Sequence, residues 1–228
     1  MIAGEKILIT GVSGTIGAAL AHHLAPDNEV WGVARFAGTE TRDKEAYTAV
    51  ATPPPSRALS TREGLEAAGV TVRAVDLGGG DLSALPGDFT YAVHLAWMRA
   101  DLAQLEDALR ANVEGAGLVL QHCRNAKAAL VMSGMGVYSA NDDPWWRYSE
   151  RDPIGRGATA YAPTSPACKL GLESVARFCA RAFDLPTVIT RLNTLTGLPG
   201  SFPAMAAAIA GCSSSAAKPV TASAGPST

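Results

Sequence analysis

The stretch Thr10-Gly11-Val12-Ser13-Gly14-Thr15-Ile16-Gly17 decides the fold expected for this chain. The short, mostly apolar run 6–10 predicts a strand, and Ile16, Leu20 and Leu24 then recur every fourth residue, as on one face of a helix. Glycines between a strand and a helix allow a tight turn, close helix–strand packing and a close approach of the backbone to a pyrophosphate. The free N–H groups at the helix N-terminus favour bound phosphates. The stretch therefore predicts a phosphate-binding turn, with ligand contacts from Gly11, Ser13, Gly14, Thr15, Ile16 and Gly17.

The rest of the chain alternates strand and helix patterns, which predicts an α/β fold, a Rossmann-like doubly wound parallel sheet with helices on both faces. Further strands are expected at 29–34, 70–75, 90–96, 128–133 and 187–192. A long helix is expected over 101–124. A second helix runs from Ser165, as N-cap with Pro166 in the first turn, to about Phe183. Residues 37–60 are interpreted as a loop with a short helix and 139–164 as a long loop.

The glycine spacing, G-x-x-G-x-x-G, resembles that of the extended short-chain dehydrogenases/reductases, the NAD(P)-dependent epimerase/dehydratase group. The resemblance covers about residues 5–200. Further stretches carry it in the same order: Val75-Asp76-Leu77, Val93-His94-Leu95-Ala96, Asn112-Val113-Glu114-Gly115 and Lys169-Leu170-Gly171-Leu172-Glu173. The resemblance implies that Asp76 and Leu77 contact the adenine and that Ala96 lines the ribose and nicotinamide side. The alternative for Asp76 is a cap at the strand end, and His94 is interpreted as a packed strand residue.

The end of the second strand favours NADP(H) over NAD(H). A site for NAD places a carboxylate there to accept hydrogen bonds from the ribose 2′-hydroxyl. This chain has Ala34 at that position, followed by Arg35 and Phe36. A guanidinium can pair with a 2′-phosphate through two hydrogen bonds. We therefore expect NADP(H) as the preferred cofactor and NAD(H) as the alternative, with Arg35 either on the 2′-phosphate or as a solvated side chain.

The catalytic positions depart from the family pattern, in which a Tyr, a Lys one helical turn later and a Ser or Thr near the end of strand five act together. Lys169 matches the lysine, but Ser165 stands at the tyrosine position and Gly134 at the usual serine position. Tyr161, on the loop before the helix, and Ser133, one residue from the usual position, are the alternative donors. The catalytic candidates are therefore Lys169, Tyr161, Ser133 and Ser165.

Two functions remain open at this point. One is an NADP(H)-dependent oxidoreductase or epimerase that acts on a carbonyl or hydroxyl of a small molecule. The other is a catalytically impaired module that holds NADP(H) as a redox sensor or scaffold. The retained Lys169 favours the enzyme, and the altered serine and tyrosine positions favour the module.

Extended members of this family usually continue further and form a substrate lobe. We assign residues 1–200 to the Rossmann domain and 201–228 to the start of a substrate lobe or a disordered tail. The substrate lobe is therefore expected to be small or incomplete, as in a C-terminally truncated member. This arrangement leaves the substrate unnamed.

The net charge, the cysteine spacing and the lack of a long apolar run exclude several classes of partner and site. The 228 residues carry a formal net charge of -2, which argues against a nucleic acid or an anionic membrane as partner. The cysteines show no zinc spacing, so no metal site is predicted. Without a leader or a long apolar run, we expect a cytoplasmic protein. The helices at 101–124 and 166–183 are apolar enough to form a homodimer, although core packing explains the same residues.

Overall fold

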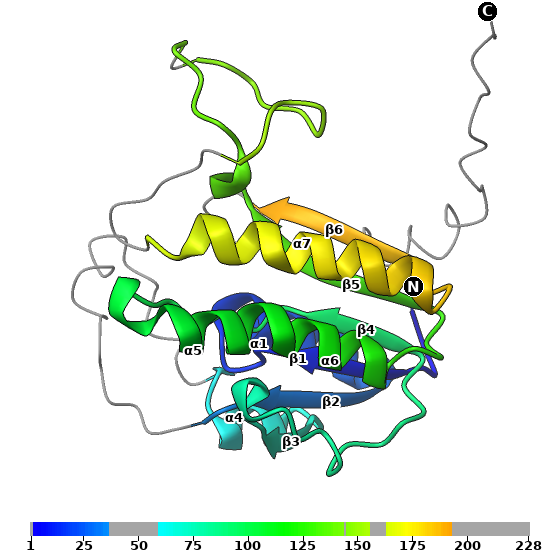
Figure 1. Ribbon diagram of the computed structural model, residues 1–228. Coiled ribbons are helices and arrows are strands. Elements are labelled where there is room, and N and C mark those ends of the chain that lie inside the picture. The colour runs from blue at the N-terminus through cyan, green and yellow to red at the C-terminus, as the bar shows by residue number, and fades with distance from the viewer. Residues whose placement is uncertain (1, 37–58, 144, 156–162, 193–228) are drawn as a thin grey trace, which may run out of the picture.

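A computed structural model describes residues 2–36, 59–143, 145–155 and 163–192 (Figure 1). Within these residues, six parallel strands form one sheet in the order β3-β2-β1-β4-β5-β6. The strands are β1 Lys6–Thr10, β2 Glu29–Ala34, β3 Thr71–Ala74, β4 Tyr91–His94, β5 Ala128–Gly134 and β6 Thr187–Leu192. This order, with its reversal between β1 and β4, confirms the doubly wound Rossmann-like sheet.

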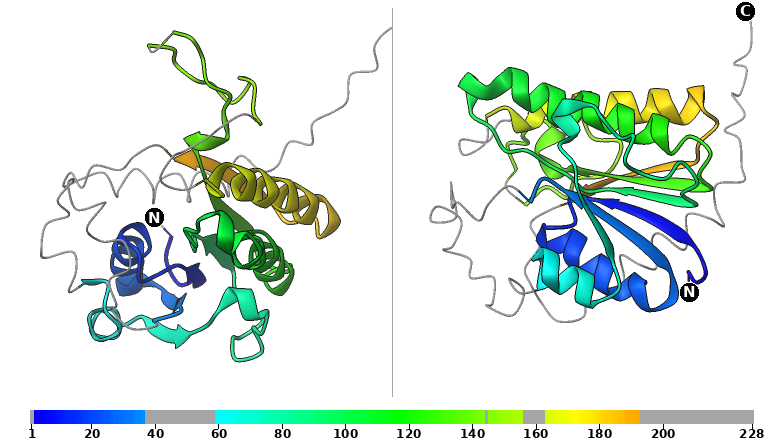
Figure 2. Two further views of the ribbon diagram at one scale, coloured as in Figure 1. Left: turned by 60° about the vertical axis from the view of Figure 1, so that its left-hand side comes forward. Right: turned by 90° about the horizontal axis from the view of Figure 1, so that it is seen from below.

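Helices cover both faces of this sheet (Figure 2). Helices α1 (Thr15–Leu24) and α4 (Arg62–Ala67) lie on one face. The other face carries α5 (Leu105–Leu109), a π-helical turn η4 (Arg110–Glu114), α6 (Gly115–His122) and α7 (Ser165–Ala182). Short 3-10 turns complete the described chain: η1 Ala25–Asp27, η2 Leu77–Gly79, η3 Leu102–Gln104 and η5 Met135–Val137.

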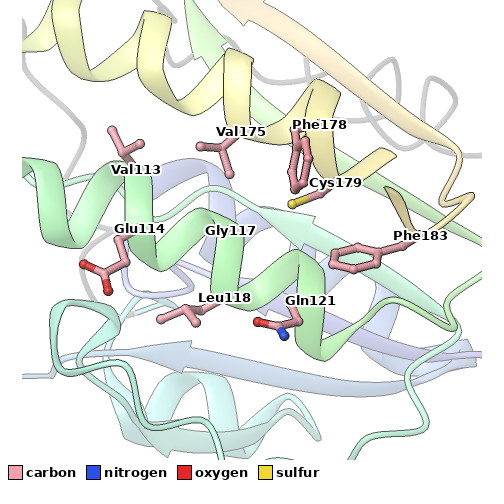
Figure 3. A pocket seen from close by; sticks show the side chains of 9 residues that line it. All are labelled: Val113, Glu114, Gly117, Leu118, Gln121, Val175, Phe178, Cys179 and Phe183. Carbon is pink, nitrogen blue, oxygen red and sulfur yellow. The ribbon is translucent and has the colours of Figure 1, made fainter. Parts of the chain in front are cut away.

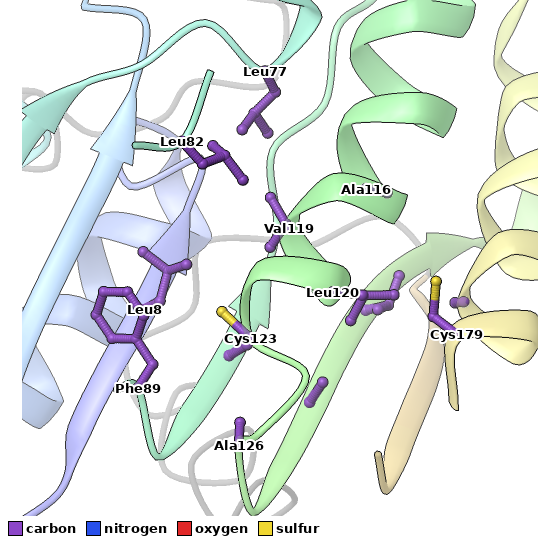
Figure 4. Packing of buried hydrophobic residues seen from close by; sticks show 14 of the residues in the cluster. Leu8, Leu77, Leu82, Phe89, Ala116, Val119, Leu120, Cys123, Ala126 and Cys179 are labelled. Atoms are coloured by element: carbon purple, nitrogen blue, oxygen red, sulfur yellow. The ribbon is translucent and has the colours of Figure 1, made fainter. Parts of the chain in front are cut away.

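The two faces enclose separate apolar clusters because successive strand residues point to opposite sides. Ile7 and Ile9 of β1 pack with Leu20 of α1, whereas Leu8 packs toward α6 with Leu120. The second cluster, which includes Phe89, Val119 and Cys123, is shown in Figure 4. Burial of these side chains contributes about 1.5–3 kcal/mol each and fixes the sheet as a rigid support for the loops at its edges.

Two expectations about the helices are wrong in detail, and one helix was not expected. Thr164, not Ser165, precedes the first residue of α7, so Ser165 lies within the first turn. The helix expected over 101–124 is divided into η3, α5, η4 and α6. Helix α4 was not expected, because in its six residues only Leu65 is buried and no apolar period develops.

Several expectations fall outside the described residues. These are the short helix expected within 37–60, Tyr161 and the whole region 193–228, with the domain boundary placed at residue 200. No helix in the described part of the chain is long and apolar enough to cross a membrane. The carboxyl ends of all six parallel strands meet at one edge of the sheet, and the predicted site residues that are described belong to this edge or to the helices that begin beside it.

Candidate functional site

The glycine turn connects β1 to α1 through hydrogen bonds of its own backbone. Gly11 has a φ of 72°, in the left-handed region that side chains other than glycine rarely adopt. Its N–H donates to the carbonyl of Val33 at 2.8 Å, and the N–H of Gly14 donates back to the carbonyl of Gly11 at 2.9 Å. These bonds fix the turn against β2 and direct the chain into α1.

The glycines of this turn have different roles. A Cβ on Gly11 would lie 2.7 Å from the backbone of Ala96, and a Cβ on Gly17 would lie 2.4 Å from the carbonyl oxygen of Gly11. The packing of the protein itself therefore requires glycine at positions 11 and 17. A Cβ on Gly14 would meet only the carbonyl oxygen of Gly11, at 3.2 Å, so its outer side is open.

The N-terminus of α1 is open in the same way. Ser13, Gly14 and Thr15 are exposed, and no side chain caps the helix. Among the described residues, nothing accepts a hydrogen bond from the backbone N–H groups of Thr15 and Ile16. Exposed, unsatisfied donors at a helix N-terminus beside a glycine turn fit the pyrophosphate of a dinucleotide.

The ends of β2 and β3 form the next part of this edge. Arg35 is exposed directly after β2, and Phe36 follows with a φ of 45°. At the end of β3, a side-chain oxygen of Asp76 accepts the N–H of Gly78 at 3.1 Å and so caps the turn η2. Leu77 is buried in the core. Asp76 thus acts as the strand-end cap, and its exposed carboxylate also borders the corner that holds Arg35.

The end of β4 carries a buried polar cluster around Thr10. The Oγ1 atom of Thr10 accepts the backbone N–H groups of Leu95 and Ala96, each at 3.2 Å. The hydroxyl of Thr10 also shares a hydrogen bond of 2.9 Å with Nδ1 of His94. Burial together with the nearby Lys169 lowers the pKa of His94 to about 3, so its ring stays neutral.

Lys169 lies on α7 beside the segment that follows β4. Its Nζ donates to the carbonyl of Met132 at 2.7 Å and lies 3.7 Å from the ring centroid of Trp97. Burial lowers the pKa of Lys169 to about 7, while the negative charge of Glu173 works in the opposite direction. A lysine amine that changes charge near neutral pH is suited to proton transfer.

Two residues that support Lys169 received no role in the sequence analysis, which quoted Asn112 only within a family motif and did not single out Trp97. Trp97 covers the ammonium, and Asn112 holds the segment that carries Trp97. The side chain of Asn112 accepts the N–H of Met98 at 2.7 Å and donates to its carbonyl at 2.8 Å. Asn112 is buried in the π-helical turn η4, and such turns often occur at functional sites. In the sequence, the signal for such a role of Asn112 was a polar residue on an otherwise apolar face of the expected helix.

The end of β5 is a closed ionic cluster. The hydroxyl of Ser133 donates to Glu173 at 2.7 Å, and Arg191 of β6 donates to both oxygens of Glu173 at 2.8 and 2.9 Å. Arg177 adds a bond of 3.0 Å. Burial opposes ionisation of Glu173, yet the hydrogen bonds outweigh it and lower its pKa to about 2. Glu173 is completely buried, so the cluster joins β5, β6 and α7.

The two remaining catalytic candidates, Ser165 and Tyr161, and two neighbouring positions, Gly134 and Tyr138, are placed as follows. Gly134 ends β5 without a break in its pairing with β6, where it lies opposite Leu192. Ser165 is partly buried in the first turn of α7, four residues before Lys169. Tyr161 lies outside the described residues. Tyr138, just beyond β5, is buried between the ring of Tyr148, 5.0 Å away, and the guanidinium of Arg191, 4.8 Å away.

A shallow apolar groove lies away from this edge, between α6 and α7 (Figure 3). Gly117 and Val175 form its floor, and Phe178, which is 63% exposed, lies at its rim with Phe183. None of the predicted cofactor or catalytic residues that the structure describes lines this groove. It therefore does not belong to the candidate site.

Comparison with known proteins agrees with this fold. Three solved structures illustrate the match. The UDP-glucuronic acid 4-epimerase from Bacillus cereus in complex with NAD is 22% identical, with a TM-score of 0.63 over 82% of this chain and 55% of that one. The UDP-N-acetylglucosamine 4-epimerase from Methanobrevibacter ruminantium M1 is 18% identical, with a TM-score of 0.61 over 83% of this chain and 55% of that one. An NAD dependent NDP-hexosamine 5,6-dehydratase involved in tunicamycin biosynthesis is 24% identical, with a TM-score of 0.58 over 82% of this chain and 54% of that one.

The chain thus spans about 55% of the length of these similar structures, and at such identities the likeness shows the fold. No curated protein matches it. The model of the NAD dependent epimerase/dehydratase family, however, matches residues 7–220, which is most of the chain. The resemblance inferred from the glycine turn and the motifs after it is therefore confirmed: this chain belongs to the NAD dependent epimerase/dehydratase family.

Proposed function

We propose that this chain forms the cofactor-binding part of an NADP(H)-dependent oxidoreductase or epimerase that acts on a carbonyl or hydroxyl of a small molecule. The observation that carries the proposal is the open N-terminus of α1, where Thr15 and Ile16 present unsatisfied N–H groups over the open side of Gly14. The pyrophosphate would lie there, with Ser13 beside it and Gly11 and Gly17 shaping the turn.

The preference for NADP(H) rests on the corner after β2. Arg35 is exposed, and among the described residues it has no ion-pair partner. Ala34 leaves no carboxylate at the position that would accept a hydrogen bond from a 2′-hydroxyl. Asp76 and Leu77 would border the adenine, and Ala96 the nicotinamide side. NAD(H) is the alternative, because the similar epimerase from Bacillus cereus is in complex with NAD.

The chemistry would be completed by Lys169 and Ser165 of α7 together with Tyr161. A bound nicotinamide supplies a hydride donor or acceptor. Lys169, with a pKa of about 7, would hold the nicotinamide ribose and exchange a proton at Nζ. Tyr161 is our candidate for the proton donor, because a phenol is a stronger acid than a serine hydroxyl. Of the two hydroxyls proposed to orient a carbonyl, Ser165 is favoured, since Ser133 already donates to Glu173.

Nucleotide sugars are the substrate class that we infer. The solved structures similar to this chain include epimerases named for UDP-glucuronic acid and UDP-N-acetylglucosamine. Because the chain covers about 55% of their length, the part of the site that selects the sugar belongs to this proposal and not to the observed geometry.

The second candidate is a module that binds NADP(H) without turnover. Gly134 and Ser165 stand where the family places a serine and a tyrosine, and the hydroxyl of Ser133 is engaged inside the protein. These observations leave the cofactor turn intact but remove the usual proton donors. In that case, the chain would act as a redox sensor or scaffold.

Calorimetric titration with NADPH and with NADH tests the shared part of both proposals. We expect the wild type to bind NADPH more tightly, and Arg35→Ala to reduce NADPH affinity by about tenfold while leaving NADH unchanged. Tighter binding of NADH would contradict the role of Arg35, and binding of neither would contradict the cofactor site. Oxidation of NADPH with a panel of UDP-hexuloses, and its loss in Tyr161→Phe, then separates the enzyme from the binding module.

We also propose that the chain forms a homodimer through α6 and α7, whose outer faces carry the groove around Gly117 and Phe178. An exposed aromatic ring beside an apolar groove favours burial against another protein surface. Size-exclusion chromatography with light scattering should show a dimer that Phe178→Lys converts to a monomer. A monomeric wild type would contradict this assignment.

A further inference from the structure

Arg62 brings a second guanidinium to the corner after β2, from a distant part of the sequence. It is the first residue of α4, and its guanidinium carbon lies 5.3 Å from the ring centroid of Phe36. Phe36 directly follows Arg35. The ring of Phe36 thus contacts Arg62 of α4 and belongs to the residue next to Arg35 in the chain.

The backbone directs Phe36 into this position. Its φ of 45° is in the left-handed region, which is unfavourable for a bulky side chain and persists only where the surroundings favour it. The ring packs against the cluster that holds α1 on the sheet. A cation over an aromatic face is held in place by the charge distribution of the ring. Phe36 therefore holds the guanidinium of Arg62 against the residue that directly follows Arg35.

The guanidinium of Arg62 forms only a weak ion pair within the protein. Its ion pair with Glu66 is long, at 3.8 Å, and both side chains are nearly half exposed. Asp76, which follows β3, directs a carboxylate oxygen to the N–H of Gly78. Arg35 is exposed directly before Phe36, and Arg62 lies over the ring of Phe36 with nearly half of its side chain exposed. A dinucleotide turn places the adenosine ribose beside the end of the second strand, where Arg35 and Phe36 lie.

We propose that Arg62 binds the 2′-phosphate of NADP(H) together with Arg35. The inference rests on the proposed cofactor site and adds a residue that the position after β2 does not reveal. A 2′-phosphate has three terminal oxygens and carries close to two negative charges at neutral pH. One guanidinium can engage two of those oxygens, and a second can engage the third while balancing the remaining charge.

The experiment measures binding of two probes that differ only by the 2′-phosphate, adenosine 2′,5′-bisphosphate and AMP. Calorimetry is run on the full chain in the wild type, Arg62→Met, Arg62→Lys and Arg73→Met. Arg73 is a matched control, because its exposed guanidinium also stacks on an aromatic ring, that of Trp31 at 5.0 Å. Trp31 belongs to the cluster on the opposite face of the sheet.

For Arg62→Met we expect about tenfold weaker binding of adenosine 2′,5′-bisphosphate and unchanged binding of AMP. Arg62→Lys should recover part of the loss, because the charge returns without the planar fork. Arg73→Met should change neither affinity. Raising the salt concentration should weaken bisphosphate binding less in Arg62→Met than in the wild type.

Two results would overturn the inference. Equal losses for both probes would mean that Arg62 only supports the fold around Phe36, and Phe36→Leu would then reproduce the loss. Unchanged binding of the bisphosphate in Arg62→Met would mean that the guanidinium is solvated. Failure of the proposed cofactor site is distinct from both, because the wild type itself would then bind neither probe nor NADPH.

Discussion

The carboxyl ends of β1 and β5 belong to the same edge of one sheet, but they satisfy their polar groups in different ways. After β1, the N–H groups of Thr15 and Ile16 have no acceptor among the described residues. After β5, Ser133, Glu173 and Arg191 are bonded to one another. The end of β1 thus leaves backbone N–H donors exposed, whereas at the end of β5 the donors are bonded to Glu173 inside the protein.

This difference indicates that the end of β1 is suited to bind a ligand, whereas the polar groups at the end of β5 hold β5, β6 and α7 together. Buried polar groups are almost always hydrogen-bonded, whereas donors exposed at a helix N-terminus are free to meet a ligand. The phosphate turn can therefore be complete while the chemistry at the end of β5 differs from the family pattern. The following substitutions test each end of the sheet separately.

The largest effect is expected from Gly17→Val. A Cβ at this position would lie 2.4 Å from the carbonyl oxygen of Gly11, so the turn must open. We expect NADPH binding to weaken by more than about 100-fold and the free energy of unfolding to fall by about 2–4 kcal/mol. Calorimetry and urea denaturation measure the two effects. Gly87→Ala is the control, because its Cβ would meet nothing within 4 Å; unaltered binding in Gly17→Val would show that the turn is not the phosphate site.

Glu173→Gln should have the next largest effect, at the other end of the sheet. The change leaves Arg191, whose side chain is only 11% exposed, without its counter-charge, and we expect a loss of about 3–5 kcal/mol at pH 7. The wild type should lose about 3 kcal/mol as the pH falls from 4.5 toward 2, because the folded-state pKa of Glu173 is lowered to about 2. Above pH 4.5 this contribution is fully present.

Urea denaturation between pH 2.5 and 7 measures this dependence. In Glu173→Gln the part of the acid dependence that Glu173 contributes should disappear. A variant with the same acid dependence as the wild type would show that other carboxylates cause it.

These two ends also show how far the sequence could be interpreted. The glycine turn and the strands were predictable because each depends on residues that are close together, such as Gly11, Gly14 and Gly17. The bonds from Asn112 to Met98 and from Ser133 to Glu173 join residues 14 and 40 positions apart. No local pattern records such pairs, since they depend on which elements the fold brings together.

Arg62 illustrates the same limit at the cofactor corner. Arg35 could be recognised because the end of the second strand has a known relation to the adenosine ribose. Arg62 lies 27 positions later in a six-residue helix that shows no apolar period, so nothing in the sequence related it to Phe36.

Lys169→Met should stabilise the protein while abolishing the proposed turnover. Burial lowers the folded-state pKa of Lys169 to about 7, so the buried charge destabilises the fold fully below pH 7 and progressively less as the pH rises toward 10.5. We expect a gain of about 1–3 kcal/mol at pH 6 that shrinks by pH 10. Thermal unfolding at both pH values measures this, with the exposed Lys127→Met as control. An equal gain at both pH values would point to packing instead of charge.

The smallest effect is expected from Ser133→Ala. Its hydroxyl is buried and donates to Glu173, but Glu173 keeps three bonds from Arg177 and Arg191, so the loss should be about 1 kcal/mol. Because that proton is already engaged, we expect kcat/KM for a UDP-hexulose to change by less than about threefold, whereas Ser165→Ala should lower it by about tenfold or more. A large loss of kcat in Ser133→Ala, with NADPH binding and stability intact, would instead assign the substrate contact to Ser133. The end of β5 would then be a catalytic site as well as the place where β5, β6 and α7 are held together, and the contrast with the end of β1 would no longer hold.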